Sequence, residues 1–334
     1  MATIKDVAKH SGLSMATVSK YLNGIKVKDA NKHSIDAAIS ELGYSPNELA
    51  RGLRTGKSYT IGVVIPELTS VFPTTILSHA EDILFDKGYS LVVSHCRSDI
   101  EREAKAVQTL LTKQVDGIVN MPSDISGNHL LPAVEKNIPV VLIDRIIPAL
   151  SGKLNAVLVD SVAAAEDMTQ LLIDAGHKDI GILLGPEHIV PFQNRYRGYL
   201  QALEKSNITP RPEFIRFANR STIQSGYDKT IELLSKSKPT ALFATNHNMT
   251  IGAVMALNDL RLQVPQDIAL AAFDDLPASR VVKPKLTLVA QPHEAIAQSI
   301  ADIMLTAIDN KHDDIVTDAV VKVHKAEIQI GESV

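Results

Sequence analysis

Residues 52–58 (GLRTGKS) look like a phosphate-binding loop. They offer glycine amides, a lysine and a hydroxyl, which are the groups that cradle the phosphates of a nucleotide. The run is one residue shorter than the G-x-x-x-x-G-K-[ST] pattern, and it precedes an expected strand where a true phosphate loop follows one. We therefore interpret residues 56–58 as a linker.

No catalytic signature stands out elsewhere. The sequence has no G-x-G-x-x-G after an expected strand, no G-x-S-x-G nucleophile elbow and no H-E-x-x-H zinc motif. Its 11 histidines show no metal-ligand spacing, and no carboxylate pair has a sequence context that favours general acid–base catalysis. We expect no enzymatic activity, no metal and no cofactor, so binding is the chemistry to look for.

Basic residues concentrate near the N-terminus. Residues 1–58 carry nine Lys and Arg against five Asp and Glu, a net charge of +4. The remaining 276 residues carry 25 against 33, a net charge of −8. This asymmetry is typical of a small anion-binding module joined to a larger body, although uneven charge on a solvated surface is an alternative.

Composition limits the class of protein. The 334 residues are enough for about two domains, and 45% hydrophobic with 22% charged residues indicates a globular chain. No apolar run of about 18 residues predicts a membrane span. The N-terminus lacks the apolar core of a signal peptide, and the single Cys96 cannot form an internal disulfide. We expect a cytoplasmic protein.

The first 46 residues are expected to form three short helices. Thr3 and Asp6 have the spacing of a capping box. Ser14 suits the N-cap of a second helix over about 15–22, and an apolar stripe predicts a third over about 32–42. Two short helices joined by a tight turn favour a helix-turn-helix, whose second helix enters the major groove of DNA. An ordinary helical corner has the same outline.

The sequence of this region is more specific than its helical outline. Residues 4–8 (IKDVA), 12–20 (GLSMATVSK) and 22–24 (LNG) strongly resemble the head of the LacI/GalR family of bacterial transcriptional regulators. Residues 42–47 (LGYSPN) and 50–53 (ARGL) resemble that family's hinge. The resemblance implies three parts: a helix-turn-helix domain over 1–46, a hinge helix and linker over 47–58, and an effector-binding and dimerisation domain over 59–334.

The resemblance implies DNA contacts at individual positions. Met15, Ala16 and Lys20 match the positions that face base edges. Met15 and Ala16 offer apolar contact only, and Lys20 replaces the usual arginine without its bidentate fork. The positions expected to touch phosphate or cap helices are Thr3, Ser14, Thr17, Ser19 and Asn23. Residues 28–34 depart from the family's hydroxyl-plus-arginine pattern, so phosphate contacts there lack support.

A fourth short helix is implied over about residues 47–53, with Ser45-Pro46 at its start. A helix of about two turns is not stable alone in water, so it is expected to fold on DNA. Leu53 matches the family's leucine that wedges into the minor groove and kinks the duplex. Packing of Leu53 on the body is the alternative. The other expected hinge contacts are Asn47, Ala50 and Arg51.

From residue 59 onward, short apolar runs alternate with helical patterns. This alternation predicts parallel sheets covered on both faces, arranged as two doubly wound α/β lobes like those of periplasmic binding proteins. The expected strands are 60–65, 90–94, 117–121, 139–143, 180–184, 215–218, 241–244, 268–273 and 286–290. Lobe 1 is expected at about 59–160 and 292–320, and lobe 2 at about 161–291 and 321–334. Ligands of such sheets bind at the carboxyl ends of the strands, here between the lobes.

The body also resembles the LacI/GalR family, through residues 140–145 (VVLIDR), 176–178 (GHK) and 273–275 (FDD) and through Arg195 with Gly198. The resemblance implies an effector cleft that includes Asp144, Arg195, Asn246 and Asp274, with Ser70, Phe72 and Gln291 nearby. Carboxylates, amides and a guanidinium suit the paired hydroxyl groups of a sugar.

Structural alternatives exist for several of these residues. Asp144 and Arg145 are able to pair at a strand end, Asp274 and Asp275 are able to cap a loop, and Phe72 is able to pack in the core.

Three positions of the cleft depart from the family pattern. Ser70 occupies a position where asparagine is frequent. Ser221 falls about where many sugar-binding members have a stacking aromatic residue, and His247 stands where an aspartate is usual. Without the aromatic ring, one hypothesis is that Arg220 or Arg195 binds the phosphate of a sugar phosphate.

The leading hypothesis is a DNA-binding regulator, most simply a repressor of carbohydrate-utilisation genes. It would bind a pseudo-palindromic operator as a homodimer, under the control of a sugar or sugar-phosphate effector. A regulator of the catabolite-control type, with a phosphorylated carrier protein as corepressor, is an alternative. A sugar-binding transport receptor is a second alternative, which the helix-turn-helix and the missing signal peptide disfavour.

Overall fold

The computed structural model describes residues 2–22, 25–44, 56–123, 125–274, 283–312 and 318–334. The chain divides into two compact units, Met1–Tyr59 and Thr60–Val334. Within the described ranges, no helix is long and apolar enough to cross a membrane. Each unit is considered by itself.

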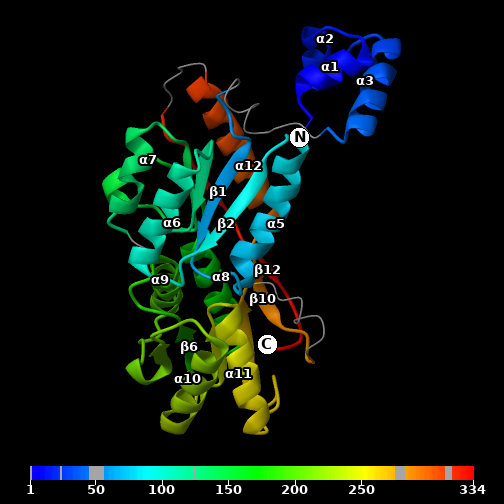
Figure 1. Ribbon diagram of the computed structural model, residues 1–334. Coiled ribbons are helices and arrows are strands. Elements are labelled where there is room, and N and C mark those ends of the chain that lie inside the picture. The colour runs from blue at the N-terminus through cyan, green and yellow to red at the C-terminus, as the bar shows by residue number, and fades with distance from the viewer. Residues whose placement is uncertain (1, 23–24, 45–55, 124, 275–282, 313–317) are drawn as a thin grey trace. The chain divides into compact units, whose positions relative to one another are not determined.

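The described residues of the first unit form three helices, α1 (Ile4–Ser11), α2 (Met15–Leu22) and α3 (Asp29–Leu42) (Figure 1). The predicted capping box is confirmed, because Asp6 N donates to Thr3 Oγ1 at 3.4 Å and Thr3 N donates to Asp6 Oδ2 at 2.8 Å. Helix α3 begins three residues earlier than expected. Its N-cap is Lys28, which makes no side-chain capping bond, so the usual start signal is missing from the sequence.

The three helices enclose a small apolar core. Val7, Val18 and Ile35 are fully buried, one from each helix, and Ala8 and Ala38 fill the space between them. This core fixes the orientation of α2, because burying Val18 turns the opposite side of that short helix toward solvent.

Lobe 1 of the second unit is built on a six-stranded, wholly parallel sheet with the order β11-β5-β4-β3-β1-β2. Its strands are β1 (Thr60–Ile65), β2 (Ser90–His95), β3 (Gly117–Asn120), β4 (Val140–Ile143), β5 (Asn155–Val159) and β11 (Val321–His324). Two helices, α5 (Val71–Asp86) and α12 (His293–His312), pack on each other along the sheet, and α6 (Ile100–Thr112) and α7 (Leu131–Glu135) cover it as well (Figure 1).

Lobe 2 repeats this plan with the order β12-β10-β9-β8-β6-β7, in which only β12 is antiparallel to its neighbour. Its strands are β6 (Ile180–Leu184), β7 (Ile215–Phe217), β8 (Ala241–Ala244), β9 (Ala269–Phe273), β10 (Thr287–Ala290) and β12 (Glu327–Gln329). One pair of packed helices is α8 (Ser161–Asp174) with α9 (Val190–Lys205). The other pair is α10 (Ile223–Lys236) with α11 (His247–Asp259).

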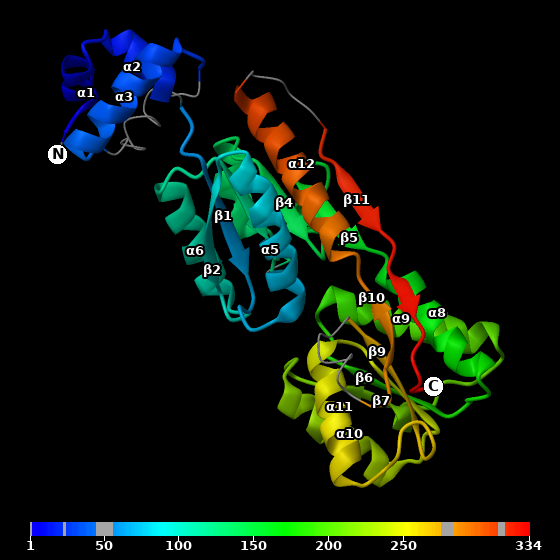
Figure 2. The ribbon, with the colours of Figure 1, turned by 90° about the vertical axis from the view of Figure 1, so that its right-hand side faces the viewer.

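The chain passes between the lobes three times, from β5 to α8, from β10 to α12 and from β11 to β12 (Figure 2). The last passage corrects the expected lobe boundary after residue 320. Val321–His324 pairs with β5 in the sheet of lobe 1, and only β12 joins lobe 2. The two edge strands are short and partly exposed, so their hydrophobic pattern does not distinguish one lobe from the other.

Candidate DNA-contact helix and interlobe site

The outer face of α2 carries the side chains expected to read DNA. Met15, Ala16 and Lys20 are exposed, and Met15 retains 48% of its accessible surface, which is unusual for a large apolar side chain. Val18 faces the opposite way and is fully buried. The helix therefore presents two apolar groups and one ammonium group to a partner.

The hydroxyl groups expected near phosphate serve in part as helix caps. Ser14 Oγ accepts a hydrogen bond from Thr17 N at 3.2 Å and lies 2.9 Å from Thr17 Oγ1. Thr3 Oγ1 donates to Asp6 Oδ2 at 2.7 Å, and these bonds hold the pKa of Asp6 below its ordinary value. Ser19 is half-buried. Asn23, Asn47, Ala50, Arg51 and Leu53 lie outside the described residues.

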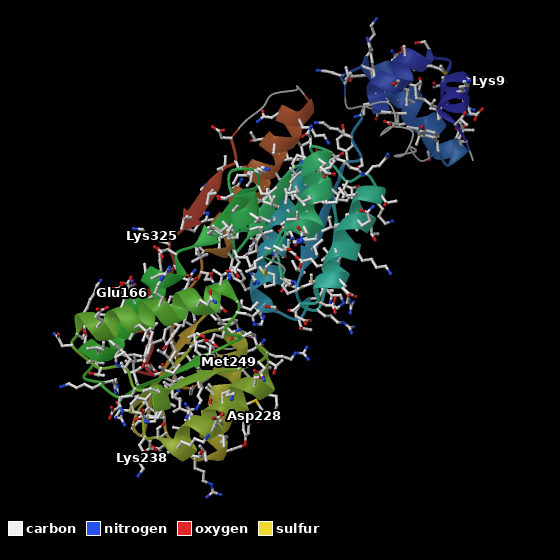
Figure 3. The ribbon with its side chains drawn as sticks, turned by 90° about the vertical axis from the view of Figure 1, so that its left-hand side faces the viewer. Lys9, Glu166, Asp228, Lys238, Met249 and Lys325 are labelled. Carbon is white, nitrogen blue, oxygen red and sulfur yellow. The ribbon has the colours of Figure 1, made fainter. Side chains whose placement is uncertain are left out.

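Basic side chains dominate the surface of the first unit. Three of its acidic groups are engaged locally: Asp6 with Thr3, Asp36 with the Tyr21 hydroxyl at 2.5 Å, and Glu41 with His10 at 2.5 Å. The exposed lysines of the unit are Lys5, Lys9, Lys20, Lys26, Lys28 and Lys32; Figure 3 labels Lys9. Such a surface attracts the phosphate backbone of DNA.

In the second unit, each lobe places an aspartate immediately after its fourth strand. Asp144 follows β4 and Asp274 follows β9, and both have a left-handed backbone, with φ of 70° and 80°. Each donates its amide to the neighbouring strand at 3.0 Å, Asp144 to Val157 O and Asp274 to Val289 O. An aspartate with positive φ is uncommon and recurs at functional sites. The two lobes therefore repeat one local geometry at the carboxyl ends of their sheets.

Asp274 is held by lobe 2 itself. Its side chain is buried, Oδ2 accepts from the backbone N–H of His247 at 3.2 Å, and Oδ1 accepts from Gln291 Nε2 at 2.5 Å. These bonds fix the carboxylate between the first turn of α11 and the end of β10.

Asp144 has fewer partners. Its side chain is 10% exposed, and the nearest cation is Arg145 Nη2, at 3.6 Å from Oδ2. Burial raises the pKa of Asp144 above its ordinary value. The positive charges of Arg145 and Arg195 act in the opposite direction, and the negative charge of Asp274 adds to the rise. Because Arg195 and Asp274 belong to lobe 2, the Asp144 carboxyl group faces charged groups across the interlobe space.

Arg195 reaches this region from α9. It is 5% exposed, donates from Nη1 to Thr245 O at 2.6 Å, and lies over the ring of Phe273, with its guanidinium carbon 3.8 Å from the centroid. Its Nε is buried and has no hydrogen-bond partner among the described residues. One turn further along α9, Gly198 allows the close approach of α8, since a Cβ atom there would lie 2.2 Å from Val162 O.

Asn246 and Ser221 bind each other. Asn246 is the N-cap of α11, with Oδ1 accepting from Met249 N at 2.9 Å, and its Nδ2 donates to Ser221 Oγ at 2.5 Å. Figure 3 labels Met249. One of the two donor hydrogens and one of the two acceptor sites of the Asn246 side chain are therefore used by the protein. Arg220, immediately before Ser221, is exposed.

The remaining predicted residues lie at the ends of elements near the passage from β10 to α12. Ser70 is half-buried and occupies the N-cap position of α5, without a side-chain capping bond. Phe72 stacks obliquely on His293, with ring centroids 5.7 Å apart. Gln291 is 5% exposed, and its buried Oε1 has no partner in the described part of the chain.

Sequence reasoning did not assign effector contacts to Arg145 or His247. Arg145 is 7% exposed, and within the described ranges its buried Nε and the buried Nδ1 of His247 have no hydrogen-bond partner. Burial lowers the pKa of His247, and the nearby Asp274 partly opposes this. Both residues directly follow a predicted contact in the sequence, and that adjacency was the available signal. In the described part of the chain, no group of three or more His, Cys, Asp and Glu is arranged to hold a metal ion.

Comparison with known proteins agrees with this architecture. A model described as bacterial regulatory proteins, lacI family, matches residues 3–47, and a periplasmic binding protein-like domain matches residues 169–334. Catabolite control protein A of Priestia megaterium is 34% identical over 312 residues, which cover 92% of this chain and 93% of that protein. The chain belongs to the LacI family.

Other LacI-family proteins are similar over the same extent. The HTH-type transcriptional repressor PurR of Proteus mirabilis is 33% identical over 319 residues, covering 94% of this chain and 92% of that protein. The Lac repressor dimer bound to operator and the anti-inducer ONPF superposes with a TM-score of 0.86 at 26% identity, covering 99% of this chain and 98% of that one. The protein is thus a LacI-family DNA-binding transcriptional repressor with the predicted helical head and two-sheet α/β body.

Proposed function

We propose that this repressor binds a pseudo-palindromic operator as a homodimer in the cytoplasm, and that a sugar or sugar-phosphate effector in the interlobe site controls its affinity for the operator. The genes it would control are those of carbohydrate use. No enzymatic step is part of this proposal.

One observation carries the effector proposal. Arg195 Nε, His247 Nδ1 and Gln291 Oε1 are all buried at one end of the lobe 2 sheet, and none of them has a hydrogen-bond partner in the part of the chain that the structure describes. Buried polar groups in native proteins nearly always have partners, so a bound molecule is the natural source of the missing ones. Each hydroxyl group of a sugar both donates and accepts, as this mixed set of atoms requires.

The DNA part of the proposal rests on the exposed face of α2. Met15 and Ala16 would contact apolar groups such as thymine methyls, and Lys20 would donate to a guanine. In a dimer, two such helices would read two half-sites, and the segment with Leu53 would enter the central minor groove. By linkage, effector and operator must change each other's affinity by the same factor.

Selection of DNA sequences by the full-length protein tests the operator proposal. We expect an enriched inverted repeat, bound with an affinity that falls steeply as salt is raised. Lys20→Ala should weaken operator binding and relax the base preference within each half-site. The free-energy difference between the preferred and the wrong base at the Lys20 contact should fall by about 1–3 kcal/mol. Binding without sequence preference would contradict the proposal.

The similarity to catabolite control protein A supports one alternative, a phosphorylated protein as corepressor. Thermal unfolding of the full-length protein with sugars, sugar phosphates, nucleobases and a phosphorylated carrier protein separates these cases. A ligand at about 100 times its Kd adds about 2.7 kcal/mol to the free energy of unfolding. Since the chain contains no Trp, calorimetry or an external dye is the readout.

A further inference from the structure

Helix α2 is held in the first unit by few contacts. The structure describes all eight of its residues, and Val18 is the only one of them that is buried. Helix α1 packs against both α2 and α3, whereas α2 and α3 approach each other less closely. A helix of two turns has little stability of its own, so its orientation depends on the side chains that anchor it. One buried valine sets how deep α2 lies, but it constrains the rotation of the helix about its own axis only weakly.

Tyr21 supplies a second anchor for α2. It lies three residues after Val18, on the same side of the helix, and its half-buried ring packs against the same apolar core. Its hydroxyl donates a hydrogen bond to Asp36 Oδ1 on α3 at 2.5 Å. Asp36 directly follows Ile35, which is fully buried, so the acceptor belongs to a well-fixed part of α3. The bond therefore ties the second turn of α2 to a fixed point on another helix.

This hydrogen bond is of a strong kind. A hydroxyl that donates to a carboxylate forms a charge-assisted bond, usually about 2.5–2.7 Å long. The bond to Asp36 also raises the pKa of Tyr21 above its ordinary value of 10.0. The hydroxyl therefore keeps the proton that it donates throughout the neutral pH range.

Electrostatic attraction to DNA does not account for Asp36. The carboxylate is exposed on a basic unit, where its negative charge opposes the approach of phosphate groups. Tyr21 is uncharged, so the bond between them does not neutralise Asp36. A geometric role does account for it, because Lys20 directly precedes Tyr21 and is exposed. Lysine carries its charge on a flexible stem without the planar fork of arginine, so its reach toward a base is defined only if its backbone is held in place.

We propose that Tyr21 is a positioning residue for operator recognition: its hydrogen bond to Asp36 fixes the rotation of α2, and with it the direction from which Lys20 reaches a base. This rests on the proposed contact of Lys20 with the operator and adds a determinant of specificity that acts through Lys20. Loss of the bond leaves the charge of the recognition surface unchanged and loosens its geometry. Specific binding therefore weakens, while binding to DNA of any sequence is maintained.

Binding of the full-length protein to three DNA duplexes tests this role. They are the operator enriched by selection, the same operator with the base pair read by Lys20 changed in both half-sites, and an unrelated sequence. The base pair read by Lys20 is the one at which Lys20→Ala loses its preference.

Tyr21→Phe keeps the ring and loses only the hydroxyl. It should reduce the ratio of the Kd for the changed operator to the Kd for the enriched operator at least threefold. Its Kd for the unrelated sequence, which depends on the charge and fold of the unit, should stay at the wild-type value. A wild-type Kd ratio in Tyr21→Phe would overturn the proposal.

A double-mutant cycle separates positioning from a merely structural role. In the Lys20→Ala background, Tyr21→Phe should leave the remaining Kd ratio unchanged, because the hydroxyl acts through Lys20. A further loss of equal size in that background would overturn the proposal while leaving the Lys20 contact in place. If Lys20→Ala itself kept every base preference of the wild type, the proposed Lys20 contact would fail, and the positioning role would fail with it.

Two carboxylates of α3 provide a matched comparison. Asp36→Ala and Glu41→Ala each remove one exposed negative charge and one bond of 2.5 Å, so both should tighten binding to the unrelated sequence to the same extent. Only Asp36→Ala should also reduce the Kd ratio, because Glu41 bonds His10 on α1. Asp36→Asn keeps an acceptor oxygen for Tyr21 and should retain more of the ratio than Asp36→Ala. Equal losses of the ratio in Asp36→Ala and Glu41→Ala would overturn the assignment, since they would show a general effect on the fold.

Discussion

Asp144 and Asp274 share a backbone and differ in their surroundings. Both end the fourth strand of a parallel sheet, both have positive φ, and both donate their amide to the next strand. Asp274 then accepts two hydrogen bonds from its own lobe, whereas Asp144 has a single cation at 3.6 Å and a pKa raised by burial. One duplicated fold therefore holds one carboxylate in place and leaves the other short of partners.

This difference indicates that the two aspartates have different structural roles. The bonded Asp274 is part of the frame of lobe 2, since it ties α11 to β10. Asp144 has no such framing bonds in the described residues, and burial disfavours its charged form and raises its pKa. Sites of function commonly carry such unfavourable local features, which the rest of the structure offsets.

The largest expected effect is that of Asp274→Ala. It leaves two buried donors without an acceptor, at about 1–3 kcal/mol each, so the free energy of unfolding should fall by roughly 3 kcal/mol. Urea unfolding followed by circular dichroism measures this. Asp228→Ala is the control, because that exposed carboxylate, labelled in Figure 3, bonds only Gln224 four residues away in the described contacts. Equal effects of the two substitutions would contradict the framing role of Asp274.

A smaller loss is expected for Gly198→Ala. The new Cβ would meet the backbone of α8, at 2.2 Å from Val162 O, and overpacking of this kind costs about 1–3 kcal/mol. Because Arg195 lies on the same helix, sugar affinity should fall as well. In lobe 1 the position of the arginine does not depend on how two helices pack, because Arg145 directly follows Asp144 in the chain. Glu204→Ala is the control, because Glu204 is exposed on α9. An unchanged melting temperature for Gly198→Ala would show that α9 can move away from α8 without cost.

A gain in stability is expected for Asp144→Asn. Since burial disfavours the charged form, the amide should raise the free energy of unfolding at pH 7 by an amount on the order of 1 kcal/mol while weakening sugar binding. The folded-state pKa of Asp144 lies above the ordinary value of 3.8, so the wild-type protein gains stability from this group as pH falls through the raised pKa. The advantage of the variant should therefore shrink in acid. An advantage that grows in acid would refute this account.

The smallest effect is expected for Arg220→Ala. Its side chain is exposed, so losing it should change the Kd of the bound sugar less than threefold and the free energy of unfolding by less than about 0.5 kcal/mol. Calorimetric titration of Arg220→Ala and Arg145→Gln side by side compares an exposed arginine with a nearly buried one. A tenfold loss at Arg220 would support the sugar-phosphate hypothesis.

Much of the fold was predictable because its signals are local. The capping box at Thr3 and the buried strands β1, β6 and β8 are visible as short patterns, and their expected limits match those observed. Strand β5 was missed because no regular α-helix separates it from β4, so strand–helix alternation breaks there. Strands β11 and β12 were missed because they are short, exposed edges whose pairing is decided by distant strands.

The residues of the candidate site could be predicted from the sequence, but their individual roles could not. The family resemblance names Asp144, Asp274 and Asn246 together, and the structure then separates them by their partners. Asn246 caps α11 and also donates to Ser221, and the second bond joins residues 25 positions apart in the chain. The missing partner of Arg145 Nε in the described structure has no signature in sequence either, because hydrogen-bond satisfaction is a property of the whole packed structure.

The three passages of the chain between the lobes have a mechanical consequence. Two bodies joined by one strand can twist, slide and bend independently, whereas three connections remove most of those degrees of freedom. What remains is close to a single angle. A ligand that bridges the lobes would then fix the angle between them. A partner that binds only one value of this angle needs no contact with the ligand itself.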